Sequence, residues 1–323
     1  MHTRVTVLAG GYGGAKLSHG LALASAARRS RGEPSLDLAI VVNTGDDLTV
    51  HGLEVSPDLD TVMYTLAGLA NHETGWGVRD ETWSGAAMFE RLGADTWFRL
   101  GDRDLATNVL RTERLRAGEP LTAVTAGLGQ ALGVEARLLP MCDPAVRTQL
   151  LTHDGWLDFQ EYFVHRHHAV PVTAVRYQGA EATWASPQAL DAIAAADLIV
   201  LAPSNPFLSI GPILALQGCA DALLAAKAPI VAVSPIVGGA ALRGPADDLF
   251  RSLGGEPSAA GVAAHYQGHH PGLLDALVID VADADLAGRV EAMGVAAVVE
   301  PTVMRVDADR QRLAEAILAR WLP

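Results

Sequence analysis

The stretch Val5–Lys16, with the sequence VTVLAGGYGGAK, decides the fold class, because an apolar run leads directly into closely spaced glycines. The run Val5–Ala9 has the length and the β-branched content of a buried strand. A helix is predicted to follow over Ala15–Arg28, because its apolar residues recur at helical spacing. A strand, a glycine-rich turn and a helix open a βαβ unit, in which the free N–H groups of the helix can bind an anion.

The glycine-rich turn fits neither of the two common phosphate-binding motifs. A Walker A loop ends in Lys followed by Ser or Thr, whereas Leu17 follows Lys16 here. The dinucleotide fingerprint needs a third small residue at the position that Lys16 occupies. A tight turn that packs the strand against the helix is the alternative, but we favour binding of a diphosphate or another substrate group. The residues predicted to take part are Gly10, Gly11, Tyr12, Gly13, Gly14 and Lys16.

Short apolar runs and helical stretches alternate along the rest of the chain. The predicted strands are Val5–Ala9, Leu38–Val42, Arg137–Pro140, Val170–Arg176, Leu198–Leu201, Ile230–Val233, Leu277–Asp280 and Ala297–Val299. The predicted helices are Ala15–Arg28, Asp60–Leu69, Gly85–Leu92, Asp104–Arg116, Leu121–Leu132, Gln188–Ala194, Ile213–Ala226, Pro245–Ser252 and Ala308–Leu322. Several strands are apolar at consecutive positions, as expected for strands covered on both faces. The fold predicted is α/β, with a doubly wound, mostly parallel, Rossmann-like sheet.

Two segments interrupt this alternation. Residues 66–133 hold helix signals without a convincing strand, which predicts a helical insertion beside the sheet. Residues 152–178 are richer in His, Tyr and Phe and predict a small β-containing excursion. Since no repeat or clear linker separates these segments from the rest, residues 1–323 are expected to form one domain with insertions.

Carboxylates gather behind the second predicted strand. Four of them lie within fifteen positions, on loops at the edge where such sheets bind ligands. They are Asp46, Asp47, Asp58 and Asp60, and the polar residues Asn43, Thr44 and Thr61 lie among them. Carboxylates of this kind suit Mg²⁺, which commonly takes one or two of them together with water and substrate phosphate. Asp46 and Asp60 are our first choices as metal ligands, although helix capping and turn formation also explain single aspartates.

Three further loops follow predicted strands or precede helices with polar or permissive residues. Asp102 and Arg103 precede a helix, where they either cap it or face a phosphate or carboxylate. Ser204 and Asn205 stand between two prolines and can hydrogen-bond a base or a ribose. The pair Gly238–Gly239 follows a rigid Ser-Pro turn. Together these loops provide more polar strand ends than packing requires, so we predict that they bind substrate.

The composition limits the classes of partner. A formal net charge of −13 argues against nucleic acid and against anionic membranes as partners. No apolar run reaches the length of a membrane span, and the chain begins with a strand rather than a signal sequence. The two cysteines, Cys142 and Cys219, suggest free thiols in a reducing compartment, so we expect a cytoplasmic protein. The histidines lack a zinc-binding spacing and are interpreted as loop residues.

In this order, the motifs resemble the 2-phospho-L-lactate transferase family of deazaflavin coenzyme biosynthesis. The segments that carry the resemblance are VTVLAGGYGGAK (5–16), VNTGDD (42–47), SPDLDTVMYTL (56–66), LGDRDLAT (100–107), RLRAGEP (114–120), FQEYF (159–163), APSNPFLSIGPIL (202–214) and SPIVGGAALRGPA (234–246). They cover essentially the whole chain. The resemblance implies a Mg²⁺-dependent transfer of a phospho-acid group from a guanosine diphosphate donor to the ribityl hydroxyl of the deazaflavin Fo, with release of GMP.

The resemblance also implies roles for single residues. The glycine loop and Lys16 would approach the diphosphate, and Asp46 and Asp60 would hold Mg²⁺. Asp47 or Asp58 would orient or deprotonate the attacking hydroxyl, and the family's habit suggests a homodimer. Ala240 and Asn108 depart from the basic residue and the histidine common in relatives, which leaves phospholactate, phosphoenolpyruvate and phosphoglycerate donors open. The principal alternative is a nucleotide-sugar-binding regulator of the same superfamily, without transferase activity.

Overall fold

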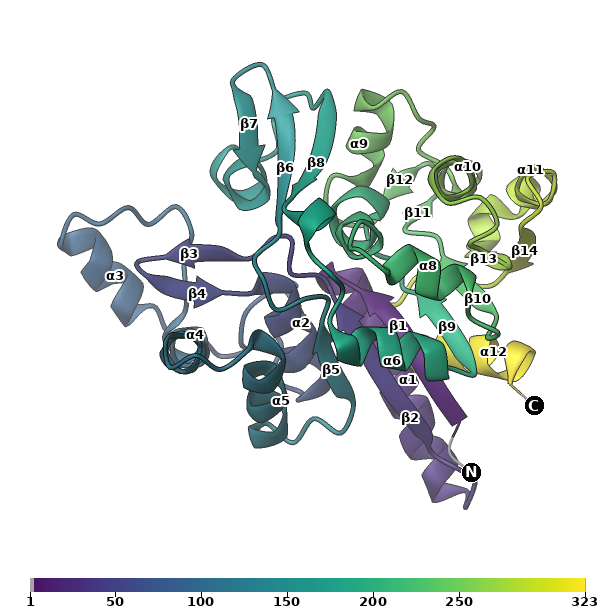
Figure 1. Cartoon of the computed structure of the whole chain (residues 1–323), viewed down its shortest axis with the longest axis horizontal. Helices are drawn as coiled ribbons and strands as arrows, with labels where there is room; N and C mark the ends of the chain where they lie inside the picture. Colours follow the sequence, from purple (N-terminus) through teal and green to yellow (C-terminus); the bar gives the residue numbers. More distant parts are fainter. Residues whose placement is uncertain (1–2, 323) are drawn as a thin grey trace.

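A seven-stranded sheet, all of whose neighbouring strands pair in parallel, forms the centre of the protein (Figure 1). The computed structural model describes residues 3–322. The strands of this sheet are β1 (Thr3–Ala9), β2 (Leu36–Val42), β5 (Arg137–Pro140), β9 (Leu198–Leu201), β10 (Ile230–Val233), β13 (Ala276–Ile279) and β14 (Ala296–Val299). Their spatial order is β14-β13-β10-β9-β1-β2-β5. The order reverses between β1 and β9, and such a switch point opens a crevice at the carboxyl ends of the strands.

Each face of the sheet packs on its own apolar core, which confirms the doubly wound α/β fold. Val5, Val7 and Ala9 of β1 contribute to one core, whereas Leu8 contributes to the other. The alternation follows from strand geometry, since successive side chains point to opposite faces. Both faces are buried, and this explains why the strands are apolar at consecutive positions.

The helices cover both faces. The first core contains residues of α1 (Gly11–Ser30), α2 (Pro57–Leu66), α5 (Leu121–Ala131) and α12 (Asp307–Trp321). The second contains residues of α6 (Pro187–Ala195), α7 (Gly211–Leu214), α8 (Cys219–Leu224), α9 (Ala246–Ser252), α10 (Ala259–His269) and α11 (Ala287–Glu291). Helix α1 approaches α12 so closely that a Cβ on Gly20 would lie 2.2 Å from the carbonyl oxygen of Arg310.

Two groups of elements project from the sheet (Figure 1). The first consists of the hairpin β3 (Leu48–Val50) and β4 (Leu53–Val55), followed after α2 by α3 (Ser84–Arg91), α4 (Asp102–Arg116) and α5. The second is an antiparallel sheet of β6 (Arg147–Thr152), β7 (Gly155–Asp158) and β8 (Ala174–Gln178), with a π-helical turn at Glu161–His165. Helices therefore occupy about half of the predicted insertion at residues 66–133, and the predicted excursion contains β structure that begins earlier, at Arg147.

Several predicted elements differ from the structure. The strand predicted at Val170–Arg176 lies at Ala174–Gln178 and belongs to the small antiparallel sheet. The helix predicted at Ile213–Ala226 is divided into α7 and α8, because Gly218 adopts φ +79°, a left-handed conformation that interrupts the helix. Helix α10 is not among the predicted helices, and His269, interpreted as a loop residue, is its last residue. The helix begins where the Ser258 hydroxyl accepts a hydrogen bond from the Gly261 N–H at 3.0 Å.

A hairpin of two short strands, β11 (Ile236–Val237) and β12 (Ala240–Ala241), follows β10 and carries Gly238 and Gly239 at its turn.

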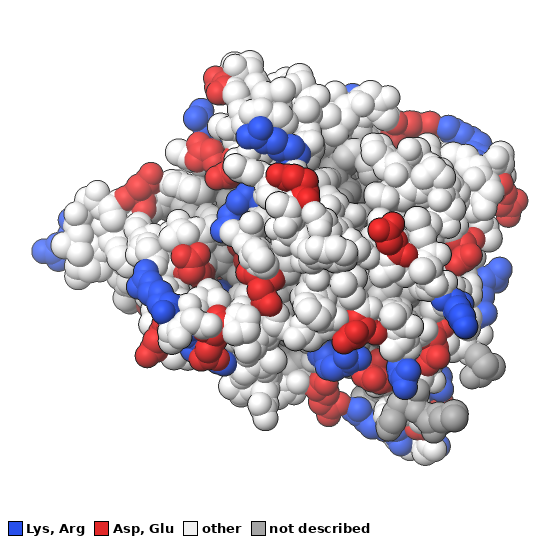
Figure 2. Space-filling model, viewed as in Figure 1, with Lys and Arg blue, Asp and Glu red and all other residues white. Residues whose placement is uncertain are grey.

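No helix among residues 3–322 combines the length and the apolar character that a membrane-spanning helix needs. Figure 2 shows acidic and basic side chains interspersed on the face in view, without an extended basic area.

Candidate active site

The site begins at the switch point, where the ends of β1 and β9 meet. The Ser204 hydroxyl donates to the Gly10 carbonyl at 2.7 Å and accepts from the Gly10 N–H at 3.2 Å. A Cβ on Gly13 would lie 2.2 Å from the Pro203 carbonyl oxygen, so only glycine permits this approach. The glycines therefore bring the N-terminus of α1 against the loop after β9, which satisfies the packing interpretation and also exposes backbone to the crevice.

Two buried carboxylates lie together in front of this helix terminus. Asp58 accepts a hydrogen bond from the Gly11 N–H at 2.7 Å and another from the Asn43 amide at 3.0 Å. The same Asn43 amide lies 3.4 Å from Asp46, whose other oxygen accepts from Gln160 at 3.1 Å. Asn43 thus links the two carboxylates, while Gln160 reaches Asp46 from the antiparallel subdomain.

Burial controls the protonation of both acids. It raises the pKa of Asp58 to about 6 and the pKa of Asp46 well above its ordinary value, and the charge of Asp58 adds to the rise for Asp46. Within residues 3–322, neither carboxylate forms an ion pair with Lys, Arg or His. A pair of desolvated carboxylates without a cationic partner favours a bound cation, which would return both to the ionised form.

Asp60 has a different environment, although we predicted it to share a metal with Asp46. The buried guanidinium of Arg111 holds both of its oxygens, with Nη1 3.0 Å from Oδ2 and Nη2 in direct contact with Oδ1. Burial raises the pKa of Asp60, and Arg111 opposes that rise. Asp60 lines the cavity, but its charge is already compensated by protein, whereas that of Asp58 is not.

Arg111 belongs to a buried network beneath the cavity. It donates to the Asn108 side-chain oxygen at 2.6 Å, and the Asn108 amide donates to the Asp104 carbonyl at 2.9 Å. Tyr64 donates to the Asp104 carboxylate at 2.8 Å. Burial raises the pKa of Asp104 to about 7, and the nearby charge of Asp60 adds to the rise. Asn108, the departure from relatives, therefore fixes Arg111 rather than facing the cavity.

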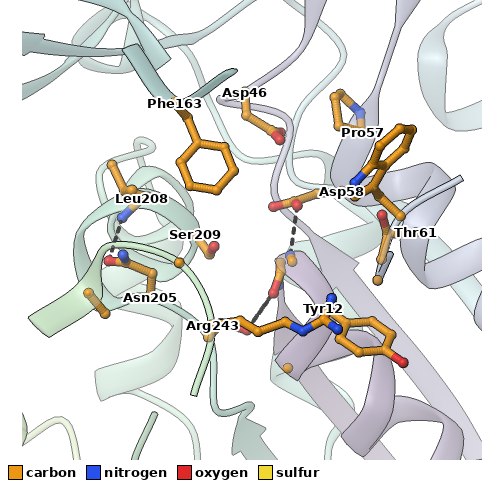
Figure 3. A pocket seen from close by; sticks show the side chains of 18 of the residues that line it. Tyr12, Asp46, Pro57, Asp58, Thr61, Phe163, Asn205, Leu208, Ser209 and Arg243 are labelled. Atoms are coloured by element: carbon orange, nitrogen blue, oxygen red, sulfur yellow. Dashed lines mark hydrogen bonds between the residues drawn. The ribbon is translucent and has the colours of Figure 1, made fainter. Parts of the chain in front are cut away.

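A cavity of about 690 Å³ opens over these groups and is lined by residues from all parts of the fold. Asp46, Asp58 and Thr61 lie on one side of it, and Asn205, Leu208 and Ser209 on another (Figure 3). The Asn205 side-chain oxygen accepts from the Phe207 and Leu208 N–H groups at 2.9 and 3.2 Å. Its buried amide nitrogen has no hydrogen-bond partner within the described chain, so this donor is available to a ligand.

Aromatic side chains form a further wall of the cavity. Phe159 and Phe163 stack with ring centroids 5.3 Å apart, and Trp97 stacks on His165 at 5.2 Å. Trp97 comes from the insertion, and Phe159 and Phe163 come from the antiparallel subdomain, so this wall joins the two projecting groups, while His165 packs behind Trp97 outside the lining. It offers flat apolar surface to a planar ligand.

The structure divides the predicted site residues into two groups. Those that line the cavity are Gly10, Gly11, Tyr12, Gly13, Lys16, Asp46, Asp58, Asp60, Thr61, Ser204 and Asn205. Those outside its lining are Gly14, Asn43, Thr44, Asp47, Asp102, Arg103, Gly238 and Gly239. Asn43 still contacts the site through Asp46 and Asp58.

The residues outside the lining have local structural contacts. Asp47 accepts from the Ser56 hydroxyl at 2.8 Å, and burial raises its pKa to about 7. Asp102 accepts from Thr82, Ser84 and Gly85, as a cap of α3 does.

Further along the chain, Arg103 donates to the Arg79 carbonyl at 3.0 Å. Thr44 lies against Cys142, and the Gly238 N–H donates to Asp283. Gly14 packs against Ser204 and Ala9.

Sequence reasoning did not single out Gln160, Phe163, Arg111 or Arg243 as site residues. The FQEYF segment contains the first two, but its pattern alone does not indicate that it folds over the carboxylates. Arg111 is one of several arginines in a polar helix, and its burial depends on tertiary packing.

A ligand cavity at the switch point of a doubly wound sheet, with desolvated acids at one end, is typical of α/β enzymes that act on small molecules. The profile of the family described as 2-phospho-L-lactate transferase CofD matches residues 5–318, and the chain belongs to this family. The family is one of phosphotransferase enzymes of coenzyme F-420 biosynthesis, which confirms the resemblance carried by the sequence motifs.

Two curated relatives extend across most of the chain. A phosphoenolpyruvate transferase of Streptomyces coelicolor is 45% identical over 323 residues, covering 97% of each chain. One of Mycobacterium avium is 43% identical over 305 residues, covering 88% of this chain and 90% of the relative.

Among solved structures, a member of the UPF0052 family from Bacillus halodurans superposes with a TM-score of 0.67 at 16% identity. It covers 98% of this chain and 99% of the other, and at this identity the similarity shows the fold alone.

Proposed function

We propose that the protein transfers a phosphoenolpyruvyl group from a guanosine diphosphate-linked donor to the terminal ribityl hydroxyl of the deazaflavin Fo, releasing GMP. The single observation that carries the proposal is the cavity at the switch point, in which two unpaired buried carboxylates adjoin a helix N-terminus. The names of the curated relatives favour phosphoenolpyruvate among the three acids left open by the sequence. The homodimer expected from the family and the cytoplasmic location stay predictions.

The donor set of the cavity fits Mg²⁺. Asp46 and Asp58 are close, buried and free of cationic partners within the described chain. Residues 3–322 contain no cluster of three or more His, Cys, Asp or Glu side chains arranged to hold a metal. A cation here would therefore take two protein carboxylates and complete its shell with substrate and water oxygens, as Mg²⁺ commonly does. We accordingly replace Asp60 by Asp58 in the proposed ligand pair.

When bound, Mg²⁺ would neutralise charge on the diphosphate oxygens. The protein residues would position the two substrates, which is the main requirement of such transfers. The N-terminus of α1 and Lys16 would bind donor oxyanions, and the free amide of Asn205 would donate to the donor or to the deazaflavin. Phe163 and its aromatic neighbours would stack on the planar deazaflavin ring.

In the reaction, the ribityl oxygen forms a bond to the phosphorus that carries the acid group, and the bond from that phosphorus to the GMP oxygen breaks. GMP leaves with the electron pair of the broken bond, and the hydroxyl proton is released to the medium. Asp47 is separated from the cavity and would orient the loop that carries Asp46 rather than touch the hydroxyl.

The test is transfer by purified protein supplied with Fo, Mg²⁺ and guanosine diphosphate derivatives of phosphoenolpyruvate, phospholactate or phosphoglycerate. Product and GMP are followed by mass-resolved chromatography. We expect product from the phosphoenolpyruvate derivative, and its loss with chelator and in Asp46→Asn and Asp58→Asn. Asp221→Asn, a change on the exposed surface of α8, is the matched control. Folded protein that yields no product but binds a nucleotide sugar tightly would favour the regulator instead.

A further inference from the structure

Arg243 lines the cavity and joins two segments that are distant in sequence. It extends from the loop after β12 towards Tyr12 (Figure 3). Its Nη1 donates to the Thr74 carbonyl at 2.5 Å and its Nη2 donates to the Glu73 carbonyl at 3.0 Å. Both segments line the cavity, so this one side chain holds the 73–77 loop against the 242–245 loop over the ligand site.

A second cation shares the ring on which Arg243 rests. The Arg243 guanidinium lies 5.0 Å from the centroid of the Tyr12 ring, and Lys16 Nζ lies 4.5 Å from the same centroid. Lys16 donates to the Met304 carbonyl at 2.8 Å. Within residues 3–322, no carboxylate forms an ion pair with either cation. The two cations that contact the Tyr12 ring therefore donate to backbone carbonyls rather than to carboxylates.

Arg243 lies close enough to Lys16 to disfavour the charged form of the lysine. Burial lowers the pKa of Lys16 to about 8, and the charges of Arg310 and Arg243 lower it further, while Asp309 opposes them. Oxyanions are the groups that such cations bind most strongly, through charge-assisted hydrogen bonds. The planar fork of a guanidinium additionally suits phosphate and carboxylate oxygens in pairs.

The cations and the carboxylates lie at different ends of the site. Figure 3 shows Asp46 and Asp58 above the N-terminus of α1, and Arg243 with Tyr12 below it. A donor that carries both a metal-binding phosphate and a further anionic group has complementary charges for each end. The end of the site that holds Arg243 and Lys16 therefore suits an anionic group of its own, separate from the group bound at the carboxylates.

We propose that Arg243 and Lys16 form an oxyanion subsite, in which Arg243 exchanges the carbonyls of Glu73 and Thr74 for phosphate or carboxylate oxygens of the donor. The proposal rests on the proposed function for the identity of the donor, but not for the chemistry of the subsite. The exchange releases the 73–77 loop from Arg243 when the donor binds. Trp76, half exposed in that loop, would then change its environment.

Binding of four anions tests the subsite: GMP, GDP, inorganic pyrophosphate and phosphoenolpyruvate, each titrated calorimetrically with Mg²⁺ present. Arg243→Ala should weaken binding of at least one anion by about tenfold to a hundredfold, the range for a lost charge-assisted hydrogen bond. Arg243→Lys should recover part of that loss, because it keeps the charge and loses the fork. Arg289→Ala is the matched control, since Arg289 pairs with Glu256 on the surface, away from the cavity.

The pattern of losses identifies the bound group. Weaker GDP and unchanged GMP in Arg243→Ala would assign the subsite to the second phosphate, and weaker phosphoenolpyruvate alone would assign it to the acid. Pyrophosphate or phosphoenolpyruvate that binds through Arg243, without any GDP binding, would support the subsite and reject the guanosine donor. Unchanged affinity for all four anions in Arg243→Ala, or no anion binding by the wild-type protein, would overturn the subsite.

Hydrogen exchange of the amides in the 73–77 loop tests whether Arg243 leaves the Glu73 and Thr74 carbonyls when an anion binds. The amides of this loop should exchange faster in Arg243→Ala than in wild type, and the anion that binds should raise their exchange rate in wild type. Arg289→Ala should behave as wild type. If the hydrogen-exchange rates of this loop change neither with the substitution nor with the anion, Arg243 does not couple the loop to the ligand.

Discussion

Replacing Arg111 by Met should destabilise the protein strongly, because it leaves the Asp60 carboxylate buried without its counter-charge. Arg111 is 2% exposed and the side chain of Asp60 is 7% exposed, and the guanidinium contacts both carboxylate oxygens. Removing one member of such a buried pair costs about 3 to 5 kcal/mol. The unfolding entropy expected for 323 residues converts this loss into a Tm lower by about 4 to 7 °C.

The assay is thermal unfolding at pH 7 of wild type, Arg111→Met, Asp60→Asn/Arg111→Met and Arg289→Met. The double variant should regain at least half of the loss, since it removes the uncompensated charge as well. Arg289→Met breaks an exposed ion pair with Glu256 and should cost no more than about 1 kcal/mol. An Arg111→Met protein that melts within about 1 °C of wild type, or a double variant that is no more stable than the single one, would refute the reasoning.

Three other substitutions test separate parts of the structure. Gly20→Ala should cost about 2 kcal/mol or more in chemical unfolding, because its Cβ would meet the Arg310 carbonyl at 2.2 Å; Gly268→Ala, with open space around it, is the control. Burial lowers the pKa of His265 from 6.5 to about 4, so the unfolded chain takes up the proton first as the pH falls. The free energy of unfolding of wild type should then fall by on the order of 2 kcal/mol as the pH drops from about 6.5 to 4, whereas His265→Phe should retain this stability. Parallel pH profiles of the two proteins would contradict this. Phe163→Ala should raise the KM for Fo about tenfold while the KM for the donor changes little, and equal changes in both would remove the stacking role.

The sequence predicted the sheet well because buried parallel strands leave an unambiguous signal. Consecutive apolar positions mark β1, β2, β9 and β10, and the loops that follow them meet at one edge by topology alone. For this reason Gly10 and Ser204, which are distant in sequence, could be expected to lie in one site. The helix α10 was missed because its Gly and His residues carry weak helix signals that tertiary packing overrides.

The direction in which a side chain points within a loop could not be predicted from the sequence. Asp46 and Asp47 are adjacent, yet only Asp46 lines the cavity. Asp58 and Asp60 begin the same helix, yet Arg111 from another helix compensates only Asp60. A pattern of aspartates locates a cluster, whereas the choice of ligand pair depends on which partner the fold brings to each carboxylate.

The position of β1 has a consequence for synthesis on the ribosome. β1 pairs with β2 on one side, but its partner on the other side, β9, emerges roughly 190 residues later. At typical elongation rates of about 5 to 20 residues per second, the free edge of this apolar strand stays unpaired for roughly 10 to 40 s. Such an exposed edge is a site for aggregation, so the nascent chain should depend on chaperones until β9 closes the centre of the sheet.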